Sequence, residues 1–178
     1  MTDYWLCQAG DTLRGQVNKR WPRRDKASDG WIGDAAHCPG TSDHCPAGDG
    51  VVRAVDLDRD LDPNDRTAME RLASQLRRYA QNREDNDRLS YVIFDGAIAS
   101  ESGGWRWRPY SGTNPHDHHM HVSFIPRGDG RGGPFTLPIF TAPKRRRLSK
   151  LIAGWSDRID MLKRRRAKAR RKRANLGD

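Results

Sequence analysis

The chain lacks any long hydrophobic run. None of its stretches approaches the roughly 18 consecutive apolar residues of a membrane-spanning helix, which excludes such a helix. Residues 1–11 also lack the basic start and apolar run of a secretory signal peptide, so we expect no standard signal peptide. Apolar residues make up only 35% of the 178 residues and charged residues 31%, which favours one domain with a tail over two separate cores.

Cysteine is scarce, with three residues at Cys7, Cys38 and Cys45. An odd number excludes a fully paired disulfide framework. Cys38 and Cys45 bracket a loop rich in Pro and Gly, where they could form a disulfide, contribute to a structural zinc site or stay free. The sequence leaves these three possibilities open.

The net charge of the chain is +10, yet most of the chain lacks any excess of positive charge. Residues 144–178 hold 15 of the 33 Lys and Arg but only 3 of the 23 Asp and Glu, a net of +12. Residues 1–143 therefore carry 18 bases and 20 acids, a net of −2, which argues against nucleic-acid binding by this part. We expect a domain over residues 1–127, a linker rich in Gly and Pro over 128–143, and a basic tail over 144–178.

The spacing of apolar residues predicts a mixed α+β domain around a small sheet. Helices are indicated by recurrence every three or four residues, and strands by alternation or by β-branched and aromatic residues. The expected helices are residues 4–20 and 66–82, and the expected strands are residues 51–57, 89–94, 98–100, 105–107 and 120–125. No long βαβ alternation is visible, so a doubly wound parallel sheet is not expected.

All six histidines fall in two clusters, His37 with His44, and four others within residues 116–121. Histidine and carboxylate together form the ligand set of catalytic zinc, which usually has three protein ligands and one open position. On a strand, His119 and His121 would point to the same face, because the side-chain period is two. From spacing alone, a catalytic metal site and an accidental surface cluster are about equally favoured.

Two other hydrolytic chemistries are disfavoured. Ser42 has no base for a catalytic triad beyond these histidines. Cys45 next to His44 suggests a thiol peptidase, but neighbours on a loop rarely have the geometry that a nucleophile and its base require.

Three short segments resemble the signature of the LAS group of zinc peptidases: Ser42-Asp43-His44, Arg53-Ala54-Val55-Asp56 and His119-Met120-His121-Val122-Ser123. This group includes D-alanyl-D-alanine carboxypeptidases and phage endolysins that cut the peptide part of peptidoglycan. Residues 24–37 and 107–116 extend the resemblance toward the peptidase domain of actinobacteriophage endolysins. The resemblance covers roughly residues 10–126 and implies a LAS/Hedgehog-like fold, a small antiparallel sheet with flanking helices.

The resemblance implies one zinc ion held by His44, Asp56 and His121. His119 takes the position of the catalytic base, just upstream of the last ligand. Asp58 is the second choice for the middle ligand, since residue 56 fits the small-x-Asp pattern better. The interval of twelve residues from His44 to Asp56 is longer than is common in this group, and a loop rich in Pro and Gly accounts for it.

Four further residues are candidates for substrate contact or for support of the ligands. Arg24 could stabilise an oxyanion, or it could be an ordinary surface residue. Asp34 and His37, three residues apart, could orient a ligand or form a structural hydrogen-bonded pair. His116 could line the cleft or lie in a solvated loop, and the aromatic residues of 105–110 could form a wall for substrate or belong to the core.

The basic tail carries an apolar stripe at helical spacing: Leu148, Leu151, Ile152, Trp155, Ile159 and Leu162. Nine bases follow within the eleven residues 163–173. Such a basic amphipathic helix with Trp155 suits an anionic membrane or an anionic wall polymer. Nucleic acid and an acidic protein partner are rivals, and a solvated tail without a specific partner is the remaining alternative.

The sequence thus predicts a zinc metallopeptidase of the phage endolysin type that hydrolyses an amide bond in the stem peptide or cross-bridge of peptidoglycan. One alternative is a D-Ala-D-Ala carboxypeptidase. A non-enzymatic nucleic-acid-binding or virion structural protein with a degenerate histidine cluster is the other. The resemblance implies a bacteriophage protein made in the host cytoplasm, which acts on the cell wall after release or is carried in the virion.

Overall fold

The computed structural model describes residues 4–34, 38, 42–82, 88–141 and 163. The chain divides into two compact units, Met1–Thr141 and Ala142–Asp178. In the second unit the structure describes only Lys163, which is helical and exposed. The rest of the predicted tail helix, including Trp155, lies outside the described residues.

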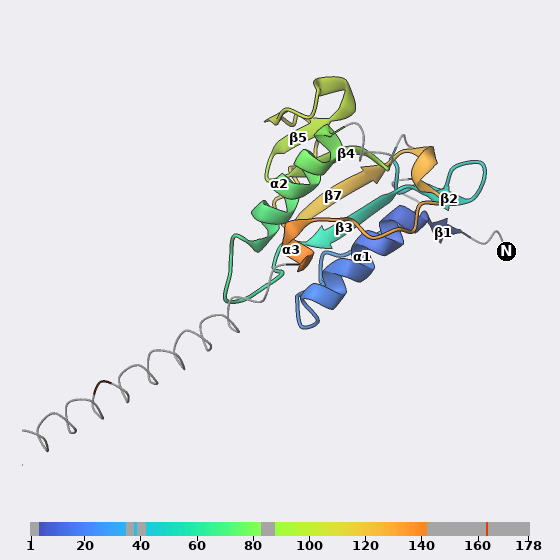
Figure 1. The fold of residues 1–178 in the computed structure, drawn as a ribbon. Coiled ribbons are helices and arrows are strands. Elements are labelled where there is room, and N and C mark those ends of the chain that lie inside the picture. Colours follow the sequence, from blue (N-terminus) through green and yellow to red (C-terminus); the bar gives the residue numbers. More distant parts are fainter. Residues whose placement is uncertain (1–3, 35–37, 39–41, 83–87, 142–162, 164–178) are drawn as a thin grey trace, which may run out of the picture. The chain divides into compact units, whose positions relative to one another are not determined.

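A five-stranded antiparallel sheet forms the centre of the first unit (Figure 1). The strands are β3 (Ala54–Asp58), β4 (Leu89–Phe94), β5 (Ala97–Ser100), β6 (Arg108–Pro109) and β7 (His119–Phe124). Their order is β3-β7-β4-β5-β6, so the last strand of the sequence lies between two earlier ones. Two short strands, β1 (Trp5–Leu6) and β2 (Val51–Val52), form a separate parallel pair. The predicted α+β class with a small antiparallel sheet is confirmed.

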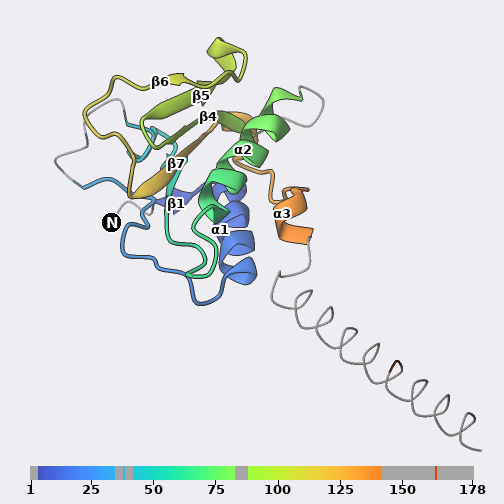
Figure 2. The same cartoon turned by 90° about the vertical axis from the view of Figure 1, so that its left-hand side faces the viewer.

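Two helices cover one face of this sheet, α1 (Gln8–Arg20) and α2 (Ala68–Gln81). Figure 2 shows both on the same side of the strands. The apolar face of α2, with Met69, Leu72 and Leu76, is buried against the sheet, as its helical spacing predicts. Among the described residues, no helix combines the length and hydropathy needed to cross a membrane.

Side chains along β3 and β7 alternate between the face of the sheet that the helices cover and the opposite face. Val55 on β3, and Met120 and Val122 on β7, are buried in the core. The residues between them therefore point away from the helices, because successive side chains of a strand lie on opposite faces. Asp56 and His121 belong to this second set.

One predicted helix begins later than expected, and one predicted strand is absent from its place. The first helix begins at Gln8 and not at residue 4, because Trp5 and Leu6 pair with β2 instead. Residues 105–107 form no strand: Trp105 has a left-handed backbone with φ 57° and its indole is buried in the core. The edge strand is the short β6 that follows.

The segment expected as a linker contributes to the core. Phe135, Leu137 and Ile139 are buried, and the compact unit extends to Thr141. The backbone amide of Phe135 donates to Gln16 Oε1 at 2.8 Å, which ties the segment to α1. Residues 128–141 thus belong to the domain, because apolar side chains at alternating positions outweigh the Gly and Pro that suggested a linker.

Candidate metal centre

The pairing of β3 with β7 brings two of the predicted ligands together. Asp56 lies opposite His121 in the antiparallel register, on the face of the sheet away from the helices. Nδ1 of His121 lies 3.0 Å from Oδ1 of Asp56. Residues 65 positions apart in the sequence therefore meet through strand register alone.

His44 reaches the same point from a loop that several contacts hold in place. The Gly33 amide donates to the His44 carbonyl at 2.9 Å, and the Arg53 amide donates to the Asp43 carbonyl at 3.1 Å. The hydroxyl of Ser123, on β7, donates to the Asp43 carboxylate. These contacts fix His44 relative to both strands that carry the other two residues.

A disulfide joins Cys38 to Cys45, the residue next to His44. Of the three possibilities that the sequence left open, the structure therefore has the disulfide. Cys7 is a buried free thiol, and burial raises its pKa to about 11. It is unsuited to nucleophilic chemistry, because the thiolate is the reactive form.

The three side chains form a group that could hold a metal ion. Nε2 of His44 lies 3.1 Å from Nδ1 of His121 and 3.1 Å from Oδ2 of Asp56. Ligand atoms of a tetrahedral zinc ion lie about 3.3 Å apart when each bond is about 2.0–2.1 Å. The separation between the two histidine nitrogens is close to that value, and each histidine lies as near to a different oxygen of the Asp56 carboxylate. Two nitrogen ligands and one carboxylate oxygen thus converge as a small cation requires.

Charge at this centre is concentrated on one carboxylate. Burial opposes ionisation of Asp56, but its contacts with His121 and His44 outweigh burial and hold its pKa far below the usual range. Burial likewise disfavours protonation of His44, yet the hydrogen bond to Asp56 raises the His44 pKa. The nearby backbone of Trp31 adds to this rise in the His44 pKa.

His119 lies beside this group on the same face of β7 as His121. Its Nε2 is 3.7 Å from Oδ2 of Asp56. Burial is the largest effect on its pKa and lowers it, which favours a neutral ring that can accept a proton. His118, by contrast, has a side chain that is 83% exposed and lies 3.6 Å from the Asp117 carboxylate.

His116 belongs to the same histidine group, although the sequence left its position open. Its ring packs edge-on against the rings of His119 and His121, with centroids 4.9 and 5.4 Å away. Burial, together with these neighbours, lowers its pKa to about 4. The backbone is left-handed, with φ 55°, a strained conformation for a non-glycine residue. Such strain is commonest at functional sites, and here it places the ring in the group.

Tyr91 on β4 is a neighbour of the group that no motif indicated. Its ring stacks on His121 with centroids 5.4 Å apart and 17° between the planes. Burial raises its pKa, so the hydroxyl is neutral. Only the place of β4 next to β7 in the sheet could have identified it, and that adjacency is tertiary information.

Asp58, the second choice for the middle ligand, is engaged elsewhere. Its carboxylate accepts hydrogen bonds from the amides of Ser28 and Asp60, at 2.9 and 2.8 Å. The structure therefore brings Asp56, and not Asp58, to the two histidines. Of the other candidates, Asp34 is exposed, and His37 lies outside the described residues.

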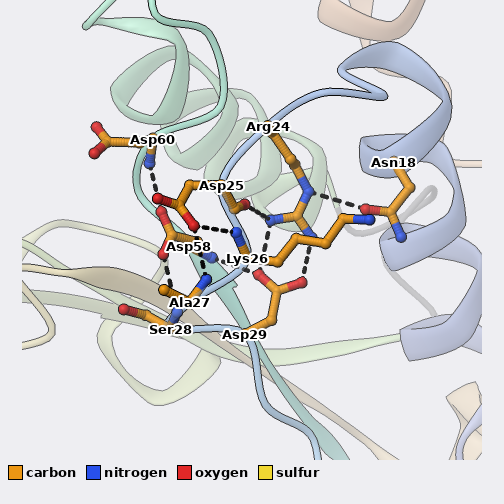
Figure 3. A network of polar contacts seen from close by, with 9 residues as sticks. All are labelled: Asn18, Arg24, Asp25, Lys26, Ala27, Ser28, Asp29, Asp58 and Asp60. Atoms are coloured by element: carbon orange, nitrogen blue, oxygen red, sulfur yellow. Dashed lines mark hydrogen bonds and ion pairs between the residues drawn. The ribbon is translucent and has the colours of Figure 1, made fainter.

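Arg24 supports the loop before the sheet and is not directed at the metal group. Its guanidinium is buried and pairs with the Asp29 carboxylate, while its Nε donates to Asn18 at 2.9 Å (Figure 3). Asp29 in turn accepts the Asp58 amide at 2.8 Å. The next residue, Gly30, pairs with Asp56 through two backbone hydrogen bonds. Arg24 thus acts on the centre only through the loop that borders β3.

We expect Arg24→Ala to lower the free energy of unfolding by about 3 kcal/mol, because it leaves the Asp29 carboxylate without its buried partner. Urea unfolding followed by circular dichroism measures the change. Arg23→Ala is the matched control: this neighbouring arginine is exposed, and its loss should cost less than about 0.5 kcal/mol. Equal losses for the two variants would contradict the role given to the buried pair.

No family model matches this chain, and comparisons with curated proteins and with solved structures find no match either.

Proposed function

We propose that this protein is a zinc-dependent peptidase that hydrolyses an amide bond in the peptide part of peptidoglycan. One observation carries the proposal: one ligand atom each from His44, Asp56 and His121 lie within 4.8 Å of one another, and His119 lies beside them. The substrate class rests on the likeness of three short segments to the LAS peptidases. The same likeness supports a LAS/Hedgehog-like arrangement of the sheet and helices.

The donor set fits zinc better than calcium or magnesium. Two imidazole nitrogens and one carboxylate suit a borderline-soft ion, whereas hard cations take oxygen ligands. Three protein ligands also leave a fourth position for water or substrate. When bound to such a set, zinc lowers the pKa of water toward about 7 and polarises a carbonyl oxygen.

In this proposal His119 acts as the general base and then as the general acid. Its neutral ring accepts a proton as water attacks the scissile carbonyl, and it then returns a proton to the leaving amine. His116 packs against both His119 and His121 and so limits the rotation of their rings. Asp56 remains ionised and compensates the positive charge that collects at the centre.

Mass spectrometry of purified peptidoglycan treated with the protein tests this proposal. We expect new peptide fragments that disappear with a chelator and return when zinc is added. Cleavage inside the stem peptide or cross-bridge indicates an endopeptidase, whereas release of the terminal D-alanine alone indicates a carboxypeptidase. Intact peptidoglycan after incubation with the zinc-loaded protein would reject the function. We also propose that the protein is encoded by a bacteriophage. It would then reach the cell wall after release from the host cytoplasm, or it would be carried there in the virion.

We propose that residues 144–178 attach the enzyme to an anionic surface, because they carry a net charge of +12. Residues 1–143 include the whole first compact unit and a net charge of −2. Truncation after Pro143 should leave hydrolysis of soluble muropeptides unchanged but sharply lower binding to cell walls or anionic vesicles. The difference between the two proteins should shrink as salt rises, since screening over about 8 Å weakens exposed charges.

Sedimentation with isolated walls at low and high salt measures this effect. Equal wall binding by the two proteins at low salt would contradict the attachment role. Much tighter binding of the full chain to DNA than to walls or vesicles would assign the tail to nucleic acid instead.

A further inference from the structure

A groove of about 560 Å³ lies between β1, the first two turns of α1, Trp31 and Gly132. We call it the aromatic groove and define it by six of its lining residues: Tyr4, Trp5, Gln8, Asp11, Arg14 and Trp31. It combines three aromatic rings with an amide, a carboxylate and a guanidinium. Apolar surface with a few polar groups is the usual make-up of a ligand site.

Two of these rings are exposed on an ordered backbone. Trp5 is 51% exposed and Tyr4 47% exposed. Trp5 is nevertheless fixed in β1, and its amide donates to the Gly50 carbonyl at 3.2 Å. Other tryptophans of the domain, Trp21 and Trp105, are buried in the core. Tyr4 and Trp5 thus leave about half of their surface accessible, and exposed apolar residues that are adjacent are a mark of a binding surface.

The polar residues of the aromatic groove suit a neutral partner rich in hydroxyl groups. Asp11 and Arg14 form an ion pair at 3.0 Å, so this part of the groove carries no excess charge. A nucleic acid or a strongly anionic polymer would instead require several unpaired bases. Gln8 adds one amide that can both donate and accept. Flat aromatic faces beside such groups match a sugar ring, which has C–H groups on its faces and hydroxyl or acetamido groups at its edge.

The aromatic groove borders the candidate metal centre through Trp31. Two residues after Trp31, the Gly33 amide donates to the His44 carbonyl at 2.9 Å. The residue before Trp31, Gly30, exchanges backbone hydrogen bonds with Asp56, at 2.7 and 3.2 Å. Consecutive Cα atoms are only about 3.8 Å apart. The groove and the candidate metal centre therefore share one segment, since Trp31 lines the groove and the adjacent Gly30 pairs with Asp56.

We propose that the aromatic groove binds the glycan strand of peptidoglycan, through N-acetylated amino-sugar units that stack on Trp5. The stem peptide attached to that strand would then extend toward His44 and Asp56. This inference rests on the proposed peptidase function, since that function supplies the substrate. It adds a second point of recognition, for the sugar, that the metal centre does not require.

Nuclear magnetic resonance titration of the full chain with a tetramer of N-acetylglucosamine tests the groove. The chain has six tryptophans, and each indole N–H gives a separate signal that single Trp→Phe variants assign. We expect the signals of Trp5 and Trp31 to shift, while those of the buried Trp21 and Trp105 stay unchanged. Trp5→Ala should weaken the affinity about tenfold, because one stacking surface is lost.

Trp107→Ala is the matched control, since Trp107 is 37% exposed and does not line the groove. It should bind the sugar as the unaltered chain does. Loss of binding in this control, or unchanged binding by Trp5→Ala, would overturn the proposal. A shift of the Trp5 signal with free stem peptide but not with the sugar would overturn it as well. The titration breaks no bond and needs no metal, so its failure is distinguishable from failure of the peptidase function.

Discussion

Replacement of His119 by alanine is expected to lower the rate of hydrolysis by about 10²–10⁴ while leaving the metal content unchanged. The ring lies 3.7 Å from the Asp56 carboxylate and outside the group of three that could hold a metal. Its removal takes away the group that moves protons but none of the ligands. The loss should appear in kcat with little change in KM, as for an interaction made only in the transition state.

Steady-state kinetics on a soluble muropeptide, with zinc measured by mass spectrometry, check this result. His118→Ala is the control, because that neighbouring side chain is 83% exposed and should affect neither quantity. Loss of zinc from the His119 variant would make His119 a ligand and displace His121 or Asp56 from that role. Unchanged turnover would remove His119 from the mechanism.

Replacement of His121 by alanine is expected to abolish stoichiometric zinc binding. This residue has contacts with both other members of the group, at 3.0 Å from Asp56 and 3.1 Å from His44. Removal of residues that merely support a ligand costs 10–100-fold in metal affinity, so loss of a ligand should cost more than about 100-fold. Competition with a chromogenic chelator measures the change.

His121 is buried and stacks on Tyr91, so its loss could also disturb the fold. Asp56→Asn serves as the second variant, since it keeps the shape of the side chain and removes only the charge. It should also lose zinc while its thermal unfolding remains cooperative. Wild-type zinc affinity in a folded His121→Ala protein would mean that the ligands are wrongly assigned.

The local pattern of the sequence was sufficient to predict the α+β class and the main elements of the domain. The apolar spacing of residues 66–82 predicted a helix, and Ala68–Gln81 forms one. The alternation of residues 120–125 predicted the strand that the structure has as His119–Phe124. These predictions succeed because burial of one face imposes a period that is visible within a few residues.

Contacts between distant residues were beyond this kind of prediction. The buried positions of Phe135 and Ile139, and the pairing of Trp5 with Val51, depend on surfaces that other parts of the chain supply. Composition suggested a linker at the first place, and the spacing of apolar residues suggested a helix at the second. Packing against α1 and pairing with β2 outweighed those local preferences, as tertiary contacts commonly do.

The sequence by itself determined which residue types are available to the candidate centre: histidines in two clusters, with carboxylates between them. Likeness to a known signature then singled out His44, Asp56 and His121. Only the tertiary structure decided that these three converge, that Asp58 and Arg24 are engaged elsewhere, and that His116 joins the group. The physical reason is that strand register and loop contacts set distances between side chains, and neither is encoded in the spacing of residues along the chain.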